Sequence, residues 1–307
     1  MTVRVPGSTS NLGSGFDCAG MAVERWLELS ARCADDRAAP AVTIDRRGAL
    51  SGLSVRPEED LVYQGFAAAC HMGRREVPRL ALTADSDIPV GRGLGSSAAA
   101  VVAGAAAAAA LLGIRLEAEA LLALCAEIEG HPDNVAPAVF GGATLALRRP
   151  AGGFLAVPLE VHPSIAFVFA VPDFPLETKR ARAALPASVP HATAAVAAAH
   201  GAALVRGLAT GESALLTIAL DDVLHVPHRR ALVCGYDAVT NAARAAGAHG
   251  ATLSGSGPTI VALTATARAA AVADAMGRAW QDAGVEAEHF VVSRRVGGYD
   301  TVLQPNS

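Results

Sequence analysis

Short stretches in which hydrophobic and polar residues alternate mark the beginning of the chain. This alternation predicts β-strands at residues 2–6, 27–33 and 41–45, because successive side chains of a strand point to opposite faces. Hydrophobic residues at helical spacing then predict helices at 60–73, 98–112 and 117–129, with strands at 80–84 and 143–148. The first half is therefore expected to combine a sheet with helices.

The same two patterns alternate in the second half. They predict strands at residues 165–171, 251–253, 260–263 and 288–293, and helices at 193–207, 230–246 and 267–283. Interleaving of this kind is typical of helices packed on a mainly antiparallel sheet. No segment of roughly 20 to 50 residues repeats along the chain, so a solenoid is excluded.

The length of 307 residues exceeds the size at which a single hydrophobic core usually stops growing. A turn rich in proline and glycine at residues 150–153 separates the two halves. We therefore predict an α+β protein with two domains, formed by residues 1–155 and 156–307.

Composition and charge limit the possible partners. The formal net charge is −4 and the arginines are scattered, so no basic surface for nucleic acid is expected. The longest apolar run, residues 98–112, is too short and too rich in alanine to span a bilayer. The five cysteines form no Cys-x-x-Cys pair, and we expect mostly buried, reduced thiols. These features predict a soluble, cytoplasmic protein that binds neither nucleic acid nor membrane.

A glycine-rich loop, followed at once by two serines and an alanine-rich helix, is the strongest functional motif. Glycines let backbone N–H groups converge, and the positive end of a helix dipole attracts anions, so this loop predicts a phosphate site. It runs through Pro89, Val90, Gly91, Arg92, Gly93, Leu94, Gly95, Ser96 and Ser97. A P-loop is excluded, because Lys179 is the only lysine of the chain. The alternative is that the glycines only end a loop and a serine caps the helix.

Two further polar clusters are candidates for chemistry. In the first, Asn11 and Asp17 follow the first strand in a glycine-punctuated turn, where they could also form only an Asx turn and a helix cap. In the second, carboxylates, an imidazole and an amide lie close together between Glu127 and Asn134. The alternative interpretation of this cluster is a solvated helix end without a chemical role. Glu127 and Glu129 cannot share one helix face, so at most one reaches a metal together with a serine hydroxyl. Such oxygen ligands favour Mg²⁺ completed by nucleotide phosphates.

A third loop, residues 250–259, is again rich in glycine and serine, and it could close over a site or form only a tight bend. Together the clusters resemble the GHMP small-molecule kinase superfamily, and the match runs from residue 3 to residue 263. The resemblance rests on residues 6–20, 88–99, 129–142 and 253–259. The run His131-Pro132-Asp133-Asn134-Val135-Ala136-Pro137 is most similar to the homoserine kinases.

The resemblance implies the two-domain GHMP kinase fold, with an N-terminal nucleotide-binding domain similar to domain 2 of ribosomal protein S5 and a ferredoxin-like C-terminal domain. ATP phosphates would lie on residues 91–97, and Mg²⁺ on Ser97 and Glu129, with Glu127 as the alternative. The amino-acid substrate would be held by Asn11, Asp17, His131, Asp133, Asn134, Thr178, Arg182 and Arg229, with Arg230 as the alternative to Arg229. Catalysis would depend on Asn134, Ser97, Glu129 and Arg182.

The implied reaction transfers the γ-phosphoryl group of MgATP to the side-chain hydroxyl of L-homoserine, for threonine biosynthesis, in a homodimer. Arginines suit the carboxylate of this zwitterion, and carboxylates suit its ammonium group. Mevalonate kinases, which resemble this chain, have a catalytic aspartate where Asn134 stands. An amide is no useful base, so the hydroxyl proton would pass to the γ-phosphate, directly or through water. The alternatives are a GHMP kinase acting on another small alcohol and a non-catalytic metabolite sensor of the same fold.

Overall fold

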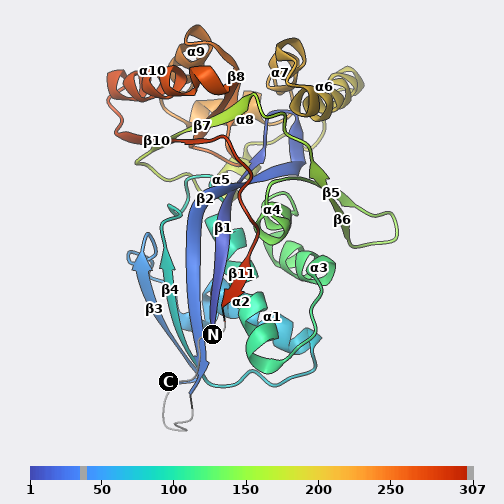
Figure 1. The fold of residues 1–307 in the computed structure, drawn as a ribbon, viewed down its shortest axis with the longest axis vertical. Helices are drawn as coiled ribbons and strands as arrows, with labels where there is room; N and C mark the ends of the chain where they lie inside the picture. Colours follow the sequence, from blue (N-terminus) through green and yellow to red (C-terminus); the bar gives the residue numbers. More distant parts are fainter. Residues whose placement is uncertain (35–39, 303–307) are drawn as a thin grey trace.

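Two β-sheets, each covered by helices, make up the protein in the computed structural model, which describes residues 1–34 and 40–302 (Figure 1). Among these residues the first sheet has seven strands in the order β11-β1-β2-β4-β3, with β5 paired to β2 and β6 to β5. The strands are β1 (Thr2–Asn11), β2 (Gly15–Cys33), β3 (Val42–Gly48), β4 (Leu80–Ser86), β5 (Ala143–Arg148), β6 (Phe154–Leu159) and β11 (Asp300–Val302). The described pairs are antiparallel, except that β3 runs parallel to β4.

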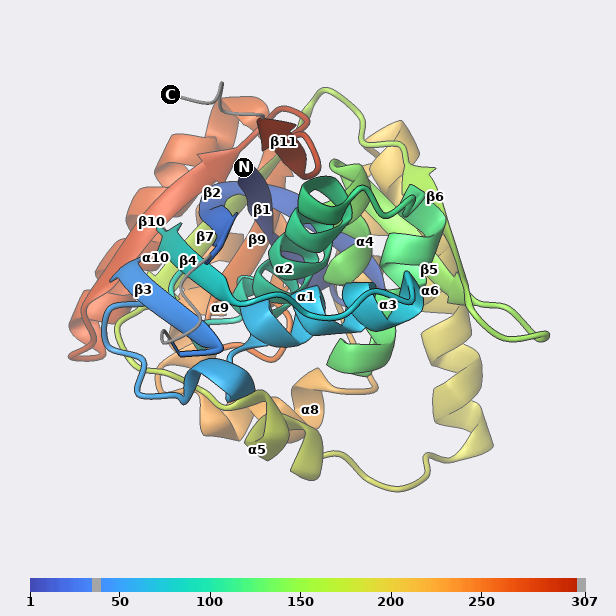
Figure 2. The same ribbon diagram turned by 90° about the horizontal axis from the view of Figure 1, so that it is seen from below.

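Helices of the first half cover one face of this sheet. They are α1 (Leu61–Met72), α2 (Ser96–Leu112), α3 (Ala118–Glu129) and α4 (Val135–Phe140), and a 3₁₀ turn at Pro57–Glu59 precedes α1. Helix α2 packs against β1 and β2, and its residues 98–108 are all buried. Alanine combines high helix propensity with a small side chain, so neighbours can enclose such a helix on every side. Figure 2 shows α1 and α3 beside α2.

The second sheet has the strand order β10-β7-β9-β8. Its elements in chain order are β7 (Ile165–Pro172), α9 (Tyr236–Ala245), β8 (Ala248–Leu253), β9 (Ile260–Ala265), α10 (Ala269–Asp282) and β10 (Ala287–Val292). The remaining helices are α5 (Thr178–Ala183), α6 (His191–Thr210), α7 (Ser213–Ala219) and α8 (Val226–Arg229), with 3₁₀ turns at Arg230–Leu232 and Thr266–Arg268. This antiparallel βαββαβ arrangement is ferredoxin-like, so the predicted fold is confirmed.

Strand β7 connects the two halves through its side chains. All eight of its residues are buried. Phe167 and Phe169 belong to the core of the first half, whereas the alternate residues Ala166 and Val168 pack with α9 and α10. A strand covered on both faces is apolar throughout instead of alternating. The second sheet is therefore fixed against the first half by a continuous apolar core.

The predicted elements are present, but some have different bounds. β1 continues to Asn11 and β2 begins at Gly15, so most of the predicted glycine-punctuated turn is paired strand. Residues 8–10 of β1 are polar yet buried, so the alternation of hydrophobic and polar residues does not reveal that the strand continues through them. The predicted helix at 230–246 is a 3₁₀ turn and then α9, because Gly235 has a φ of 78°. Several short elements, β6, β11, α4, α5, α7 and α8, were not predicted.

The predicted boundary between the two domains, at residues 155 and 156, can be compared with the strand pairing of two segments. Strand β6 contains both residues and pairs with β5 of the first sheet. Strand β11, near the end of the chain, also returns to the first sheet and pairs with β1, as Figure 1 shows. The assignment of residues to two domains stays a prediction.

Two other features concern the surface. Cys70 and Cys125 are buried, but Cys33 and Cys234 are exposed and Cys18 is half-buried, so the expectation of mostly buried thiols is wrong. By length and composition alone α6 is apolar enough to cross a membrane, and most of its residues are not buried in the protein. A single helix of this kind is weak evidence for a membrane span, and α6 packs against α7.

We expect Gly95→Ala to destabilise the protein through a collision as well as backbone strain. Gly95 precedes α2 with a φ of 71°, and a Cβ there would lie 2.1 Å from Ser8 Oγ. Gly113, at the other end of α2, has a φ of 63° but open space around its Cβ position, so Gly113→Ala is the matched control. Strain alone should lower the free energy of unfolding by about 1 kcal/mol in the control. Urea denaturation should show a loss of about 2 to 3 kcal/mol for Gly95→Ala; equal losses would contradict the steric explanation.

Candidate active site

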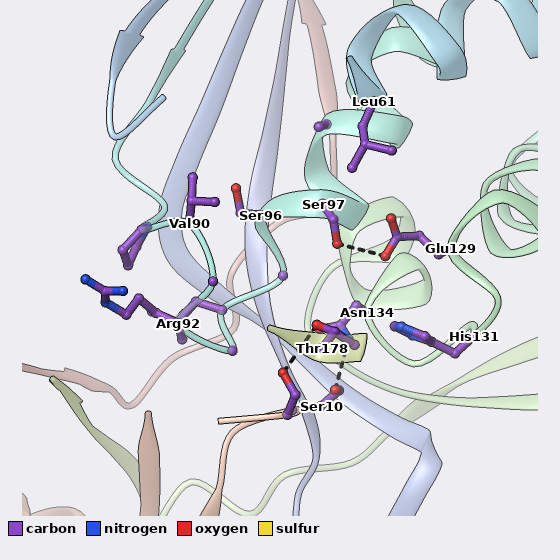
Figure 3. Close-up of a pocket in the computed structure, with 18 of the residues that line it drawn as sticks. Ser10, Leu61, Val90, Arg92, Ser96, Ser97, Glu129, His131, Asn134 and Thr178 are labelled. Carbon is purple, nitrogen blue, oxygen red and sulfur yellow. Dashed lines mark hydrogen bonds between the residues drawn. The ribbon is translucent and has the colours of Figure 1, made fainter. Parts of the chain in front are cut away.

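One cavity of about 450 Å³ lies between the two halves, and a cavity of this size suits a small-molecule ligand. It brings together every site residue predicted from the sequence: Asn11, Asp17, Pro89, Val90, Gly91, Arg92, Gly93, Leu94, Gly95, Ser96, Ser97, Glu129, His131, Asp133, Asn134, Thr178, Arg182 and Arg229. Figure 3 shows part of this lining. Glu127 is exposed and does not line the cavity.

The glycine loop at residues 89–95 connects β4 to α2 and is held from two sides. The backbone N–H of Ser8 in β1 donates to the carbonyl of Leu94 at 3.0 Å. On the other side, Ser254 Oγ donates to the carbonyl of Gly93 at 2.6 Å. Gly93 has a φ of 75°, and a Cβ there would lie 2.2 Å from the carbonyl oxygen of Ser254. The loop at 254–257 therefore does more than form a bend, because it supports the glycine loop and lines the cavity with Gly255 and Ser256.

The start of α2 faces the cavity with free backbone N–H groups. Gly95 is the N-cap residue and no side chain caps the helix, so Ser96 and Ser97 are its first two residues and not its caps. The first turn of this 17-residue helix also contains no acidic side chain. The uncapped N–H groups and the positive end of the helix dipole make this position suitable for a phosphate.

Ser97 and Glu129 meet where α2 begins and α3 ends. Ser97 Oγ donates to Glu129 Oε2 at 2.8 Å, the contact drawn in Figure 3. Burial raises the pKa of Glu129, an effect that the hydrogen bond from Ser97 partly opposes. The described residues contain no group of three or more His, Cys, Asp or Glu side chains that could form a complete metal cage. Two protein oxygens beside a phosphate loop nevertheless fit Mg²⁺, which usually keeps waters and nucleotide phosphates as its other ligands.

The side chain of Asn134 is fixed by two serines of β1. Ser8 Oγ donates to Asn134 Oδ1 at 2.9 Å, and Asn134 Nδ2 donates to Ser10 Oγ at 2.9 Å. Figure 3 shows Asn134 beside Ser10. Ser10 lines the cavity but was not predicted as a site residue, because a serine within a strand gives no signal of its own.

His131 and Asp133 form a hydrogen-bonded pair in the wall of the cavity. The distance between His131 Nδ1 and Asp133 Oδ1 is 2.6 Å, and Asp133 is only 2% exposed. Burial alone would lower the pKa of His131, but the hydrogen bond and charge of Asp133, with a contribution from Glu129, raise it above its ordinary value. The pair therefore favours an imidazolium beside a carboxylate.

Asp17 and Arg182, which both line the cavity, join the first half of the chain to α5. Arg182 donates to both carboxylate oxygens of Asp17, at 2.8 and 3.2 Å, and each side chain is 37% exposed. The hydrogen bonds that Arg182 donates to Asp17 raise the pKa of Arg182. Asn11 fixes the same region, since its Oδ1 accepts from the N–H of Asp17 and its Nδ2 donates to the carbonyl of Gly255. Asn11 has a φ of 69°, which asparagine tolerates better than most residues.

Arg229 is the buried cation of the site. It is 2% exposed, lines the cavity and has no carboxylate within ion-pair distance among the described residues. Burial lowers the pKa of Arg229, and the nearby charge of Arg182 acts in the same direction. Arg230, the alternative in the sequence, is exposed and faces Asp237 instead. The structure therefore favours Arg229 over Arg230 as the site residue.

The apolar end of the cavity was not predicted. Its side chains come from separate segments and include Leu50, Leu53, Val55, Leu61, Val62 and Ala84. Asp60 also lies here, where it caps α1 through the N–H of Val62 and pairs with Arg46 at 2.8 Å. An apolar slot beside a phosphate loop suits a nucleoside base, and the charged residues at the opposite end suit a small zwitterion.

Comparison with known families agrees with this arrangement. The model of the GHMP kinases N terminal domain matches residues 60–142, and the model of the GHMP kinases C terminal matches residues 209–282. Fold, site and family models together define a GHMP kinase.

Individual relatives give a finer assignment. The chain is 42% identical to a homoserine kinase of Nostoc sp., with 94% of each chain covered, and 44% identical to one of Gloeobacter violaceus, with 92% of this chain and 94% of the relative covered. The crystal structure of a homoserine kinase from Cytophaga hutchinsonii superposes with a TM-score of 0.88 at 29% identity, covering 98% of this chain and 97% of that one. The chain belongs to the homoserine kinases within the GHMP kinases.

Proposed function

We propose that this protein transfers the γ-phosphoryl group of ATP to the side-chain hydroxyl of L-homoserine, and so makes O-phospho-L-homoserine for threonine biosynthesis. One observation carries the proposal: a single cavity joins an uncapped helix N-terminus to the buried, unpaired cation of Arg229. The first suits the phosphates of ATP, and the second suits the carboxylate of an amino acid. Homoserine carries that carboxylate and a hydroxyl at its other end.

The triphosphate would lie along residues 91–97, with the base in the apolar slot. Phosphoryl transfer requires mainly alignment of donor and acceptor and compensation of developing charge. Alignment alone can contribute about 7 to 11 kcal/mol. The two-sided support of the glycine loop provides this rigidity on the nucleotide side.

Mg²⁺ would be held by Ser97 and Glu129, whose oxygens already lie 2.8 Å apart. When bound, the ion supplies positive charge next to the phosphates. Glu129 must be deprotonated for this role, and the hydrogen bond from Ser97 favours the deprotonated form against the effect of burial.

Asn134 would orient the acceptor hydroxyl. Its amide is held by Ser8 and Ser10 and cannot take up a proton at neutral pH. The proton of the hydroxyl would therefore leave to the γ-phosphate, directly or through water. At the far end of the substrate, Arg229 and Arg182 would bind the carboxylate, and Asp17 and Asp133 would face the ammonium group, with His131, Asn11 and Thr178 completing the wall.

The first test is ADP release by the purified protein with ATP, Mg²⁺ and one acceptor at a time. We expect L-homoserine to give a kcat/KM at least about 100-fold above that for L-threonine, mevalonate or shikimate. Mevalonate and shikimate lack the ammonium group that Asp17 and Asp133 would face, and L-threonine carries its hydroxyl one carbon nearer to its carboxylate. Faster turnover of another alcohol would support a different GHMP kinase. Nucleotide binding without turnover of any acceptor would support the metabolite sensor.

The second test separates positioning from metal binding. Asn134→Ala should lower kcat about 100-fold with little change in KM for ATP, because the acceptor loses its orientation. Glu129→Gln should cause the greater loss and raise the Mg²⁺ concentration needed for half-maximal rate, because a carboxylate ligand is removed. The matched control is Glu127→Gln, two positions away on the exposed face of α3, which should stay within twofold of the parent. Steady-state kinetics at varied Mg²⁺ distinguish the three variants, and near-normal rates for the first two would contradict these roles.

We also propose a homodimer in the cytoplasm without nucleic-acid or membrane partners. The support is indirect: the formal net charge of −4 does not favour nucleic acid or an anionic membrane, and α6 and α7 expose single apolar side chains, including Val196, Val205 and Ile218, that a partner chain could cover. Sedimentation equilibrium should give twice the 31.0 kDa mass of the chain, whereas the mass of a single chain would contradict the dimer.

A further inference from the structure

We propose that His225, at the start of α8, is a positioning residue that fixes the guanidinium of Arg229 for the substrate carboxylate. This inference rests on the proposed function, since it assigns Arg229 to the carboxylate of the acceptor. His225 is fully buried and does not line the cavity. Its effect on the substrate is therefore indirect, through the orientation of Arg229.

The guanidinium of Arg229 is held by uncharged hydrogen-bond acceptors and by an aromatic ring. Arg229 Nε donates to the carbonyl of Ala181 in α5 at 3.1 Å. Its Nη1 lies 3.4 Å from His225 Nδ1 and 3.5 Å from the carbonyl oxygen of Gly255. Figure 2 shows α5 and α8 next to each other, which agrees with the hydrogen bond between Arg229 of α8 and Ala181 of α5. The side chain also lies over the ring of Phe16, with its Cζ 5.3 Å from the ring centroid.

None of these acceptors carries a negative charge. A carboxylate in place of His225 would form an ion pair with Arg229 and compete with the substrate carboxylate for it. A neutral imidazole accepts a hydrogen bond and leaves the positive charge of the guanidinium available. His225 therefore orients Arg229 without neutralising it.

The tautomer of His225 follows from its two partners. A guanidinium only donates hydrogen bonds, so Nδ1 must be the unprotonated acceptor. Nε2 then carries the proton and donates to the carbonyl of Gly13 at 3.2 Å, with Asp222 Oδ2 farther away at 3.7 Å. Burial lowers the pKa of His225, although the charge of Asp222 opposes this effect, and the neutral ring is favoured.

The imidazole is itself held firmly. Asp222 Oδ2 accepts from the backbone N–H groups of His225 and Val226, both at 2.7 Å, which fixes the start of α8. The ring stacks on Phe16, with centroids 5.1 Å apart and an angle of 23° between the planes. His225 thereby connects Arg229 with the turn after β1, whose neighbours Asn11 and Asp17 line the cavity.

Two substitutions separate the roles of the two ring nitrogens. The amide of His225→Asn can present an acceptor near the position of Nδ1, whereas the amide of His225→Gln reaches the position of Nε2 and leaves Arg229 without its side-chain acceptor. The matched control is His228→Gln, which changes an exposed histidine of the same helix. Thermal unfolding and KM for ATP, measured for each variant, report whether the fold and the nucleotide site are intact.

Kinetics with two acceptors test the inference. His225→Gln should raise KM for L-homoserine about 10-fold or more, the effect of a lost hydrogen bond to a charged group, with kcat and KM for ATP within about threefold. His225→Asn should retain KM for L-homoserine within about threefold, and the His228→Gln control should match the parent. With 3-aminopropan-1-ol, which is homoserine without its carboxylate, His225→Gln and the parent should have equal kcat/KM, or equal Ki against homoserine where turnover is too slow.

The outcomes distinguish this inference from the function on which it rests. A parent enzyme that phosphorylates homoserine, with a His225→Gln variant that is unchanged or equally impaired toward both acceptors, would overturn the role of His225 alone. A greater loss in His225→Asn than in His225→Gln would also overturn it, since the contact with Gly13 would then matter more than that with Arg229. A parent enzyme that does not turn over homoserine would overturn both proposals.

Discussion

The active site depends on how its glycine loop is held. A phosphate-binding loop must leave its backbone N–H groups free toward the ligand, so the hydrogen bonds that fix it must use its carbonyl groups. Here the carbonyls of Leu94 and Gly93 are taken by Ser8 of β1 and Ser254 of the β8–β9 loop. The two supporting residues belong to different halves of the molecule. Both supports are therefore present only while the two halves stay together, and the apolar faces of β7 contribute to this packing.

The charges of the site follow a second constraint. Removing a charge from water is costly unless the charge is paired or hydrogen-bonded. Asp17 with Arg182 and Asp133 with His131 are paired within the protein. Arg229 has only uncharged acceptors among the described residues, so its burial is incompletely compensated until an anion enters the cavity. The cavity wall therefore contains one buried guanidinium that has no carboxylate partner among the described residues.

Sequence patterns identified the long helices, the antiparallel second sheet and the residues of all three polar clusters. They did not identify the second part of β1, because Ser8, Thr9 and Ser10 are buried polar residues whose partners lie elsewhere in the chain. The apolar slot was missed for a related reason, since Leu50, Val62 and Ala84 come from separate elements. A short helix such as α8 has little helical periodicity to detect, and part of its stabilisation comes from distant residues, as in the hydrogen bond from Arg229 to Ala181.

The sequence by itself determined the chemical types that are present: a glycine loop without lysine, serines at a helix start, and clustered carboxylates, amides and arginines. These depend on residue identity and on spacing within one segment, which a single chain displays directly. Only the tertiary structure shows that Glu129 and Arg229 line the cavity while Glu127 and Arg230 are exposed, because packing determines which of two neighbouring side chains is buried. It alone revealed the contact between His225 and Arg229, which depends on how α8 lies against α5 and the turn after β1.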